Sequence, residues 1–406
     1  MAKRKKAPSR AETKNRLVAA ADALSLPGRF DVAVVGGGAS GLVAAIAAAE
    51  AGARTVVLER SLECGKKILA TGNGRCNFAN EELDADRFND PAFVAATCGK
   101  SDSWLSDVLG FWRSCGLAWT SEEGRLYPLS LQAASVRNVL LRRAENAGVV
   151  LATDREVSSC SPASPAGSWT VKWRRVEGAG EGKLAAAAVV LASGAALPTF
   201  TGIELKREPF SPILCPIAAQ PVDRSVDLGL LCGRRAKCRV ALLRDGDEVY
   251  AENGEVLFRP EGLSGIVVFD LSRRVRQGDV VELDLARGLG EEEVRALVDA
   301  GGADGVLDPA IASALGGDRS AIELARKLRF EVAGLMETNK AQVMRGGLCV
   351  DQFSPASLEA KTAPGLHACG EALDVDADCG GFNLAWAWKS GMVAGAAAAG
   401  RALGRN

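Results

Sequence analysis

Three glycines near the N-terminus have the spacing that a dinucleotide-binding turn requires. Gly36, Gly38 and Gly41 follow the apolar run 32–35 in the pattern G-x-G-x-x-G. The first glycine permits a tight turn, the second lets the backbone approach a pyrophosphate, and the third lets the next helix pack closely on the sheet. The free N–H groups at the start of that helix then face the phosphates. The pattern favours a dinucleotide site over a glycine-rich turn without a ligand.

An acidic residue follows at the expected distance. The apolar run 55–58 ends at Glu59, which lies 18 residues beyond Gly41. A carboxylate about 20 residues after the glycines commonly binds a ribose hydroxyl. The elements that must position these residues are a strand over 32–35, a helix over 42–51 and a second strand over 55–58. Together they predict the first βαβ unit of a Rossmann-like α/β fold.

Composition limits the function classes. A chain of 406 residues predicts two or three domains, and 48% hydrophobic residues with a net charge of −1 suit a soluble globular enzyme. Eleven cysteines without a C-x-x-C pair predict reduced thiols and argue against a dithiol–disulfide reductase. No apolar run is long enough for a membrane span, and no apolar segment typical of a secretory signal follows the basic start. We therefore expect a cytoplasmic protein with no membrane partner; the oligomeric state stays open.

The single histidine, His367, excludes metal sites built from histidine clusters, and we predict no metal. We expect this histidine, in an apolar strand, to be structural.

The first 16 residues contain seven Lys or Arg and one Glu. Terminal charge runs are usually only solvated, which favours a solvated tail. The alternative is a weak handle for RNA or another polyanion.

The remaining periodicity predicts two different parts of the chain. Up to residue 212 we expect helices over 103–115 and 134–147, a meander within 156–187 and a strand over 188–192. From 213 onward, short β-like runs predict a small barrel or sandwich, followed by a helical segment and a return to the first domain. These runs are 240–244, 255–258, 266–271 and 280–285. Near the C-terminus we expect a strand over 365–369 and a helix over 384–403. The predicted organisation is a basic tail and lead-in helix (1–27), a discontinuous domain (28–212 and 336–406), and an insertion (213–335) with a β part (213–285) and a helical part (286–335).

Three further segments are specific enough to indicate a family. They are the glycine-rich basic loop 64–77 (CGKKILATGNGRCN), the motif 262–265 (GLSG) and the late segment 364–391 (PGLHACGEALDVDADCGGFNLAWAWKSG). With the N-terminal glycines, they resemble the YhiN/BaiN-like FAD-dependent flavoproteins, also labelled aminoacetone oxidase family FAD-binding enzymes or NAD(P)/FAD-dependent oxidoreductases. The resemblance covers the chain from about residue 30 to 400. It implies a two-dinucleotide-binding FAD domain with an inserted β-barrel plus helical domain.

The resemblance also implies FAD as the resident cofactor, and it assigns residues to it. The first group surrounds the pyrophosphate and ribose: Gly36, Gly38, Ala39, Ser40, Gly41, Glu59 and Arg60. The second group would lie along the flavin: Lys67, Thr71, Gly72, Asn73, Arg75, Cys76 and Asn77. The third group comes from later loops: Gly194, Gly370, Glu371, Gly380, Gly381, Phe382 and Asn383. Cys76 and Cys379 could equally be packing thiols, and Asp374 and Asp376 could cap turns. The catalytic residues are unknown at this stage.

The implied activity is reduction of an activated C=C bond by hydride transfer through flavin N5, with NAD(P)H as a transient donor. The substrate would be a small molecule or a structured RNA. The alternatives are amine oxidation with O2, reduction of an RNA uridine, and a non-catalytic flavin-binding redox partner.

The chain departs from the family pattern in three places. A helix expected after Gly194 is missing from the short segment 195–209. No histidine precedes the motif at 262–265, so a histidine acid or base cannot be transferred to this chain. Arg345 stands where relatives often have a threonine before Gly346 and Gly347.

Overall fold

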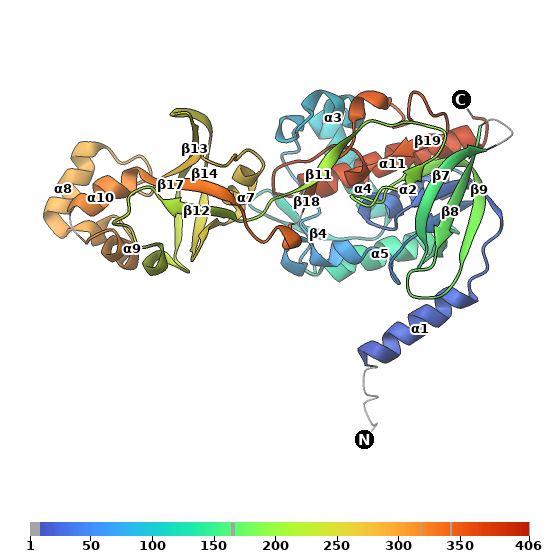
Figure 1. Cartoon of the computed structure of the whole chain (residues 1–406), viewed down its shortest axis with the longest axis horizontal. Coiled ribbons are helices and arrows are strands. Elements are labelled where there is room, and N and C mark those ends of the chain that lie inside the picture. Colours follow the sequence, from blue (N-terminus) through green and yellow to red (C-terminus); the bar gives the residue numbers. More distant parts are fainter. Residues whose placement is uncertain (1–8, 164–166, 318, 342, 406) are drawn as a thin grey trace, which may run out of the picture. The chain divides into compact units, whose positions relative to one another are not determined.

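The computed structural model describes residues 9–163, 167–317, 319–341 and 343–405 (Figure 1). The chain divides into two compact units. Unit 1 comprises Met1–Ser211 and Arg345–Asn406, and unit 2 comprises Pro212–Met344. Unit 2 thus extends past residue 335, where the predicted insertion ended.

Unit 1 is built on a mostly parallel sheet. Its strand order is β10-β7-β8-β9-β1-β2-β6, and β19 also pairs with β9. The parallel strands are β1 (Arg29–Val35), β2 (Thr55–Leu58), β6 (Val150–Ala152), β9 (Glu181–Leu191) and β19 (Leu366–Ala368). In register, Val32 lies opposite both Thr55 and Ala188. β1 and β2 are buried almost throughout, as expected of parallel strands covered on both faces.

The meander between these parallel strands consists of β7 (Glu156–Ala163) and β8 (Ser168–Arg174), which run antiparallel and lead into β9. β9 includes most of the separate strand that we predicted over 188–192. Its burial alternates from Leu184 to Ala188 and is continuous from there to Leu191. The two-residue strand β10 (Thr199–Phe200) pairs with β7.

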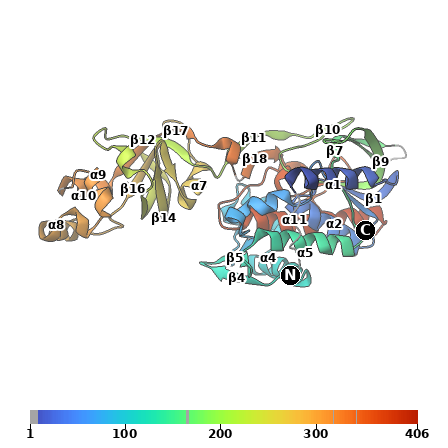
Figure 2. The same cartoon turned by 90° about the horizontal axis from the view of Figure 1, so that it is seen from below.

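Two helices of unit 1 lie against this sheet, α2 (Ala39–Glu50) and α11 (Phe382–Ala402) (Figures 1 and 2). α5 (Ala133–Asn146) packs on α2, and α3 (Pro91–Cys98) and α4 (Ser101–Ser114) pack on α11. α2 and α11 touch through glycines: a Cβ added at Gly391 or Gly395 would lie 2.6 Å from the Ser40 oxygen or 2.2 Å from the Ala44 oxygen. A small sheet of β3 (Ala79–Asn80), β5 (Arg125–Pro128) and β4 (Trp119–Glu122) completes this part.

Unit 2 contains a closed barrel with its own hydrophobic core. The strands follow one another around it as β12 (Ile217–Pro221), β15 (Gly262–Ser264), β14 (Asp247–Arg259), β13 (Arg235–Arg244), β16 (Val280–Asp284) and β17 (Leu328–Leu335). β17 pairs with β12 and closes the ring. Inside, the rings of Phe258 and Phe330 lie 6.1 Å apart. The helices are α6 (Leu228–Leu231), α7 (Ile266–Ser272), α8 (Glu291–Gly301), α9 (Pro309–Ala314) and α10 (Arg319–Arg326).

Two predicted elements in unit 2 were wrong. The run 266–271, predicted as a strand, forms α7, because Gly265 at φ +116° ends β15 and the chain turns into a helix. Short apolar runs do not distinguish a buried strand from a buried helix. The segment 328–335, assigned to the helical part, forms β17, where buried Leu328, Phe330 and Val332 alternate with exposed residues.

The chain passes between the units through β11 (Arg207–Ile213) and β18 (Val343–Leu348), which pair as a two-stranded sheet. At the N-terminus, α1 (Arg10–Ala23) forms within the predicted lead-in segment; residues 1–8 of the predicted basic tail lie outside the described residues. In the described part of the chain, no helix has both the length and the apolar character needed to cross a bilayer.

Candidate cofactor site

The glycine turn after β1 leaves space at only one of its three motif glycines. A Cβ added at Gly36, which has φ +101°, would lie 2.5 Å from the Ala192 oxygen. A Cβ at Gly41 would lie 1.9 Å from the Gly36 oxygen, whereas a Cβ at Gly38 would meet no atom within 4 Å. Gly36 and Gly41 are therefore required by contacts within the protein. Gly38 borders open space, as a position that a pyrophosphate approaches should.

The first turn of α2 faces this space. Gly38 is the N-cap of α2 and provides no side chain to the free N–H groups, so Ala39 and Ser40 begin the helix with its positive end uncapped. Ser40 is buried next to the segment 369–381 between β19 and α11, which we call the late loop. A Cβ at Gly370, which has φ +61°, would lie 2.4 Å from Ser40 Oγ. The Gly370 N–H donates to Ser390 Oγ at 3.0 Å, which fixes the late loop on α11.

Glu59 lies at the end of β2 and holds the glycine turn. Its Oε2 accepts the Gly37 N–H at 2.7 Å, and its Oε1 accepts the Ser61 N–H at 2.7 Å. Each carboxylate oxygen retains a lone pair that could accept a ribose hydroxyl. Arg60, beside it, is exposed.

The second loop, predicted to lie along the flavin, is a tightly wound turn over Lys66–Gly74. Gly72, Asn73 and Cys76 have φ of +54°, +53° and +59°, and Thr71 Oγ1 donates to the Ile68 oxygen at 2.7 Å. The Cys76 side chain is buried, and burial raises the pKa of its thiol to about 11. The Cys76 thiol therefore lacks the lowered pKa that is typical of a nucleophilic cysteine.

Three predicted residues from distant parts of the sequence meet beside this loop. Lys67 Nζ donates to Glu371 Oε2 at 2.8 Å, which joins the second loop to the late loop. A Cβ at Gly194, which has φ +58°, would lie 3.4 Å from the same Glu371 oxygen. No helix follows Gly194: the described segment up to β11 holds only β10, in agreement with the shortened sequence.

Arg75 has two partners within the protein. Its guanidinium forms an ion pair with Glu122 on β4 and lies 4.4 Å from the centre of the Tyr127 ring on β5. The hydrogen bond from Arg75 lowers the pKa of the Glu122 carboxyl, so both groups are charged at neutral pH. Arg75 is thus held by the β4–β5 hairpin, and its position along the flavin stays a prediction.

The late loop ends in a glycine pair that starts α11. Gly380 and Gly381 have φ of +120° and +96°, and a Cβ at Gly381 would lie 2.4 Å from the Ala79 oxygen. Phe382 is buried, and Asn383 Oδ1 accepts the Ala377 N–H at 3.0 Å while its Nδ2 donates to the Ala377 oxygen at 2.8 Å. α11 starts without a side-chain cap, so a second uncapped helix N-terminus lies next to the loops just described.

Asp374 and Asp376 connect the late loop to β18. Arg345 donates to both Asp376 oxygens at 2.9 Å, and Asp374 Oδ1 accepts the Gly346 N–H at 3.0 Å. Burial raises the pKa of the Asp374 carboxyl. Arg345 therefore holds this loop against β18.

Two buried polar atoms in these loops have no hydrogen-bond partner among the described residues: Asn77 Oδ1 and Ser193 Oγ. Buried polar atoms normally have partners, so both are consistent with a bound ligand that completes them. The sequence analysis included Asn77 but missed Ser193. Ser193 follows β9 and directly precedes Gly194, and this position could have identified it as a cofactor-binding residue. Together with the open space at Gly38, these atoms show that the residues fit a dinucleotide cofactor.

His367 is buried in β19 with Nδ1 3.0 Å from the Ser357 oxygen, and burial lowers its pKa. Across the described residues, no group of three His, Cys, Asp or Glu side chains is arranged to hold a metal ion.

Comparison with known proteins identifies the family. The chain matches the model of the HI0933-like protein Rossmann domain over residues 30–210 and 276–397. It is 33% identical over 414 residues to the 3-dehydro-bile acid delta(4,6)-reductase of Clostridium scindens, covering 91% of this chain and 99% of that protein. It is 26% identical over 401 residues to the ribosomal RNA dihydrouridine synthase of Escherichia coli, covering 89% of this chain and 96% of that protein.

Among solved structures, a 3-ketosteroid-delta4-(5alpha)-dehydrogenase from Rhodococcus jostii aligns with a TM-score of 0.48 at 14% identity, covering 93% of this chain and 98% of that one. The family match and the near-complete alignment to the reductase confirm the resemblance drawn from the motifs. The chain belongs to the HI0933-like family of FAD-binding Rossmann-fold proteins and is an FAD-dependent oxidoreductase.

Proposed function

We propose that this protein reduces a C=C bond conjugated to a carbonyl group in a small molecule, with NAD(P)H as the electron donor. The observation that carries the proposal is the 33% identity, over nearly the whole of both chains, to a reductase whose name places the reduced bonds at Δ4 and Δ6 of a 3-dehydro bile acid. The residues of the candidate site support the proposal, because the site has open space at Gly38 and the uncapped N-termini of α2 and α11 border its loops.

In this proposal, each loop of the site binds a different part of FAD. The free N–H groups of Ala39 and Ser40 bind the pyrophosphate, and Glu59 binds the adenosine ribose. Lys67, Glu371 and Ser193 surround the middle of the cofactor. Asn77 and the N-terminus of α11 provide the polar groups along the flavin, where a positive helix end stabilises negative charge.

FAD supplies hydride transfer at its N5 atom when bound. The protein must then place the substrate carbon opposite that atom and exclude water. The sequence contains no second G-x-G-x-x-G motif. The nicotinamide donor would therefore bind transiently rather than in a second dinucleotide domain.

A second candidate substrate is a uridine in structured RNA. Its C5=C6 bond is also conjugated to a carbonyl, and the relative from Escherichia coli is named as a ribosomal RNA dihydrouridine synthase. Amine oxidation and a non-catalytic redox role have less support, because both relatives are named for reactions other than amine oxidation.

Anaerobic half-reactions distinguish these options. The purified protein should be yellow and should bleach with NADH or NADPH, and the rates identify the donor. The reduced protein should then be reoxidised rapidly by a steroid 4-en-3-one. Reoxidation by a uridine-containing RNA but not by the enone would select the second candidate. Rapid reoxidation by O2 alone, with an amine able to reduce the protein, would contradict both.

A further inference from the structure

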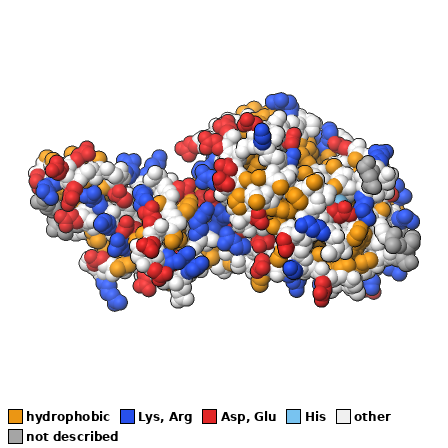
Figure 3. Space-filling model, turned by 90° about the horizontal axis from the view of Figure 1, so that it is seen from above, with side chains coloured by type: hydrophobic (Ala, Val, Ile, Leu, Met, Phe, Trp, Pro, Cys, Tyr) orange, Lys and Arg blue, Asp and Glu red, His pale blue; other side chains and the backbone are white. Residues whose placement is uncertain are grey.

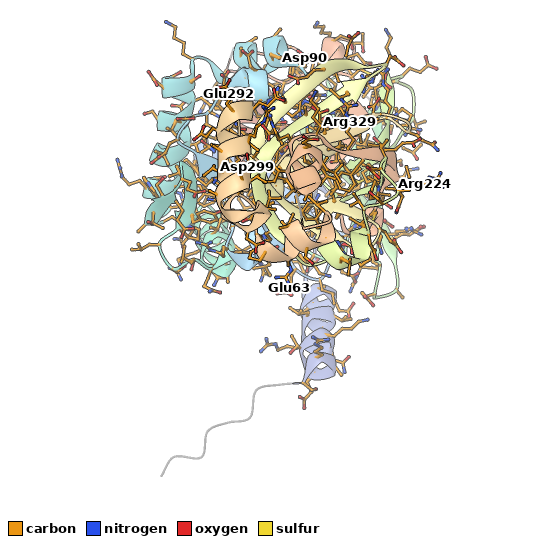
Figure 4. All side chains as sticks on the ribbon, turned by 90° about the vertical axis from the view of Figure 1, so that its left-hand side faces the viewer. Glu63, Asp90, Arg224, Glu292, Asp299 and Arg329 are labelled. Carbon is orange, nitrogen blue, oxygen red and sulfur yellow. The ribbon has the colours of Figure 1, made fainter. Side chains whose placement is uncertain are left out.

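Three N–H groups beside the C-terminal end of α1 are buried and have no hydrogen-bond partner among the described residues. They are Arg155 Nε, Trp173 Nε1 and Arg175 Nη2. α1 projects from unit 1 (Figures 1 and 4), and two of these residues hold its last turn. Arg155 Nη2 donates to the Ala21 oxygen at 3.0 Å, and Arg175 pairs with Asp22 at 2.6 Å. Buried polar groups normally have partners, so the three donors indicate an acceptor from outside the described chain.

The three donors lie on one face of the β7–β8 hairpin. Trp173 is in β8 and Arg175 directly follows it, so the two side chains, two residues apart in extended chain, point to the same side. Arg155 directly precedes β7, and the pairing of Glu156 with Arg174 puts Arg155 across from Arg175. The Arg155 guanidinium lies 4.6 Å from the centre of the Trp173 ring. The hairpin thus brings the three donors together.

Arg155 is a buried cation without a carboxylate partner. Only 4% of it is exposed, and no Asp or Glu of the described residues lies within ion-pair distance of it. Its other N–H groups donate to the backbone carbonyls of residues 21, 153 and 154. Burial, together with the positive charge of Arg175, lowers the pKa of the Arg155 guanidinium. The charged side chains in Figure 3, in contrast, lie at the surface with both signs interspersed. Buried charges are normally paired, which Arg155 is not.

The neighbouring carboxylate of Asp154 is already fully used. Asp154 is completely buried, and its Oδ1 accepts the N–H groups of residues 176 and 177. Its Oδ2 accepts the N–H of Gly178 and the Arg175 Nε. These four hydrogen bonds occupy the lone-pair sites of a carboxylate. Asp22 pairs with Nη1 of Arg175, so it does not serve the three free donors either.

The charge and number of the donors indicate the class of acceptor. Three N–H groups beside an unpaired guanidinium suit a monovalent anion. An oxyanion would bring several oxygens, and those left without donors in a buried site would cost free energy. A water molecule would bring hydrogens that need acceptors of their own and would not compensate the charge of Arg155. A halide accepts all three N–H groups on one atom and has neither disadvantage.

We propose that Arg155, Trp173 and Arg175 bind a halide ion, with chloride as the natural ligand, between the β7–β8 hairpin and the last turn of α1. The ion joins the two arginines that hold α1, so it stabilises the attachment of this helix to unit 1. The site also adjoins the end of β2, because the Arg155 N–H donates to the Glu59 oxygen at 2.8 Å. The proposal goes beyond the proposed function and does not depend on it, since none of the three residues is assigned to FAD or substrate.

Bromide and chloride are the probes that test the proposal on the FAD-loaded protein. In crystals grown with bromide, anomalous diffraction should show a peak in contact with the three nitrogens. In solution at constant ionic strength, replacing gluconate by chloride should raise the temperature of thermal unfolding in a saturable manner. The expected shift is roughly 2–4 °C at a chloride concentration ten times Kd. Circular dichroism follows the unfolding and gives Kd from the dependence on chloride.

Two tryptophans of β8 provide a matched pair of variants. Trp173→Phe removes a free N–H and should raise Kd for chloride roughly tenfold, since a hydrogen bond to a charged group is lost. Trp169→Phe removes an N–H that already donates to the Pro364 oxygen at 3.1 Å. This control should unfold at a lower temperature in both salts but keep the chloride-dependent shift. Arg155→Gln removes the unpaired charge and should abolish the shift.

Three results would overturn the proposal. They are the absence of an anomalous peak at the three nitrogens, equal unfolding temperatures in chloride and gluconate, and a wild-type Kd for chloride in Trp173→Phe. Stabilisation by sulfate in place of chloride, with the same loss in Trp173→Phe, would overturn the assignment to a halide. If Arg155→Gln does not fold, Trp173→Phe and its control Trp169→Phe decide the outcome.

Discussion

Gly38 and Gly41 stand three residues apart, but their surroundings differ. Gly41 has the Gly36 oxygen where its side chain would be, and Gly38 has open space. We predict that Gly38→Val folds normally but is purified without flavin, because the valine occupies the space of the pyrophosphate. Gly41→Ala should instead lower the free energy of unfolding of the apoprotein itself.

Thermal unfolding of both variants with and without added FAD checks this difference. Wild type should gain stability from FAD by mass action, about 2.7 kcal/mol at a ligand concentration 100 times Kd, and Gly38→Val should gain none. Full FAD occupancy of Gly38→Val would refute the assignment of this turn.

The ion pair of Arg75 with Glu122 allows us to test whether the Arg75 charge changes the midpoint potential of the flavin. If Arg75 lies along the flavin, Arg75→Ala should lower the midpoint potential by roughly 20–65 mV, equivalent to about 1–3 kcal/mol. Glu122→Gln should raise it, because the guanidinium loses its carboxylate partner. Spectroscopic redox titration, with FAD occupancy measured alongside, gives both values.

The two variants distinguish an effect of the Arg75 charge on the flavin from mere support of the loop. If the ion pair only supports the loop, Arg75→Ala and Glu122→Gln should have the same effect. In that case both variants would lose FAD while the potential of the remaining bound flavin stayed constant. Arg75 would then be removed from the list of flavin-side residues.

At the scale of elements, the sequence predicted those with a strong local pattern. The turn at Gly36 to Gly41 located β1 and α2, and amphipathic spacing located α4 and α5 to within two residues at each end. α7 was mispredicted because a short apolar run does not distinguish a buried strand from a buried helix. β17 was mispredicted although its alternation of Leu328, Phe330 and Val332 with polar residues is a strand pattern that the sequence already contains. The contact of Lys67 with Glu371 could not be predicted either, since 304 positions separate them and only the fold brings them together.

The glycine contact between α2 and α11 determines how α2 is placed under the cofactor. Gly395→Ala would put a Cβ 2.2 Å from the Ala44 oxygen, so the helices must move apart. We predict a loss of about 1–3 kcal/mol in the free energy of unfolding and weaker FAD binding, because the first turn of α2 shifts with the helix.

Gly110→Ala is the matched control. Gly110 is exposed within α4 and has no neighbouring atom within 4 Å of its added Cβ, so the variant should gain up to about 1 kcal/mol. Urea unfolding and FAD titration of both variants provide the comparison. Equal stability of Gly395→Ala and wild type would show that the helices adapt without cost.

At the scale of the whole molecule, each unit has a hydrophobic core of its own. We predict that unit 1 folds and binds FAD when residues 212–344 are replaced by a short glycine-rich linker between β11 and β18. Residues 212–344 expressed alone should give a cooperatively unfolding β-rich domain without flavin. Circular dichroism, denaturant unfolding and flavin absorbance measure these properties.

The excised unit 1 should still be reduced by dithionite but should turn over no enone if unit 2 contributes to substrate binding. Loss of FAD from a folded unit 1 would show instead that the insertion is needed for the cofactor. Turnover at the wild-type rate would exclude unit 2 from the reaction.

The contacts of Gly36 and Gly41 within the glycine turn have a consequence for how the enzyme is assembled. Because protein atoms border both positions, we predict that the turn keeps its shape in the protein without cofactor. Translation and activation are then separate events. A cell short of riboflavin would accumulate folded, colourless chains rather than degraded ones, and restoring the vitamin would recover activity without new protein synthesis.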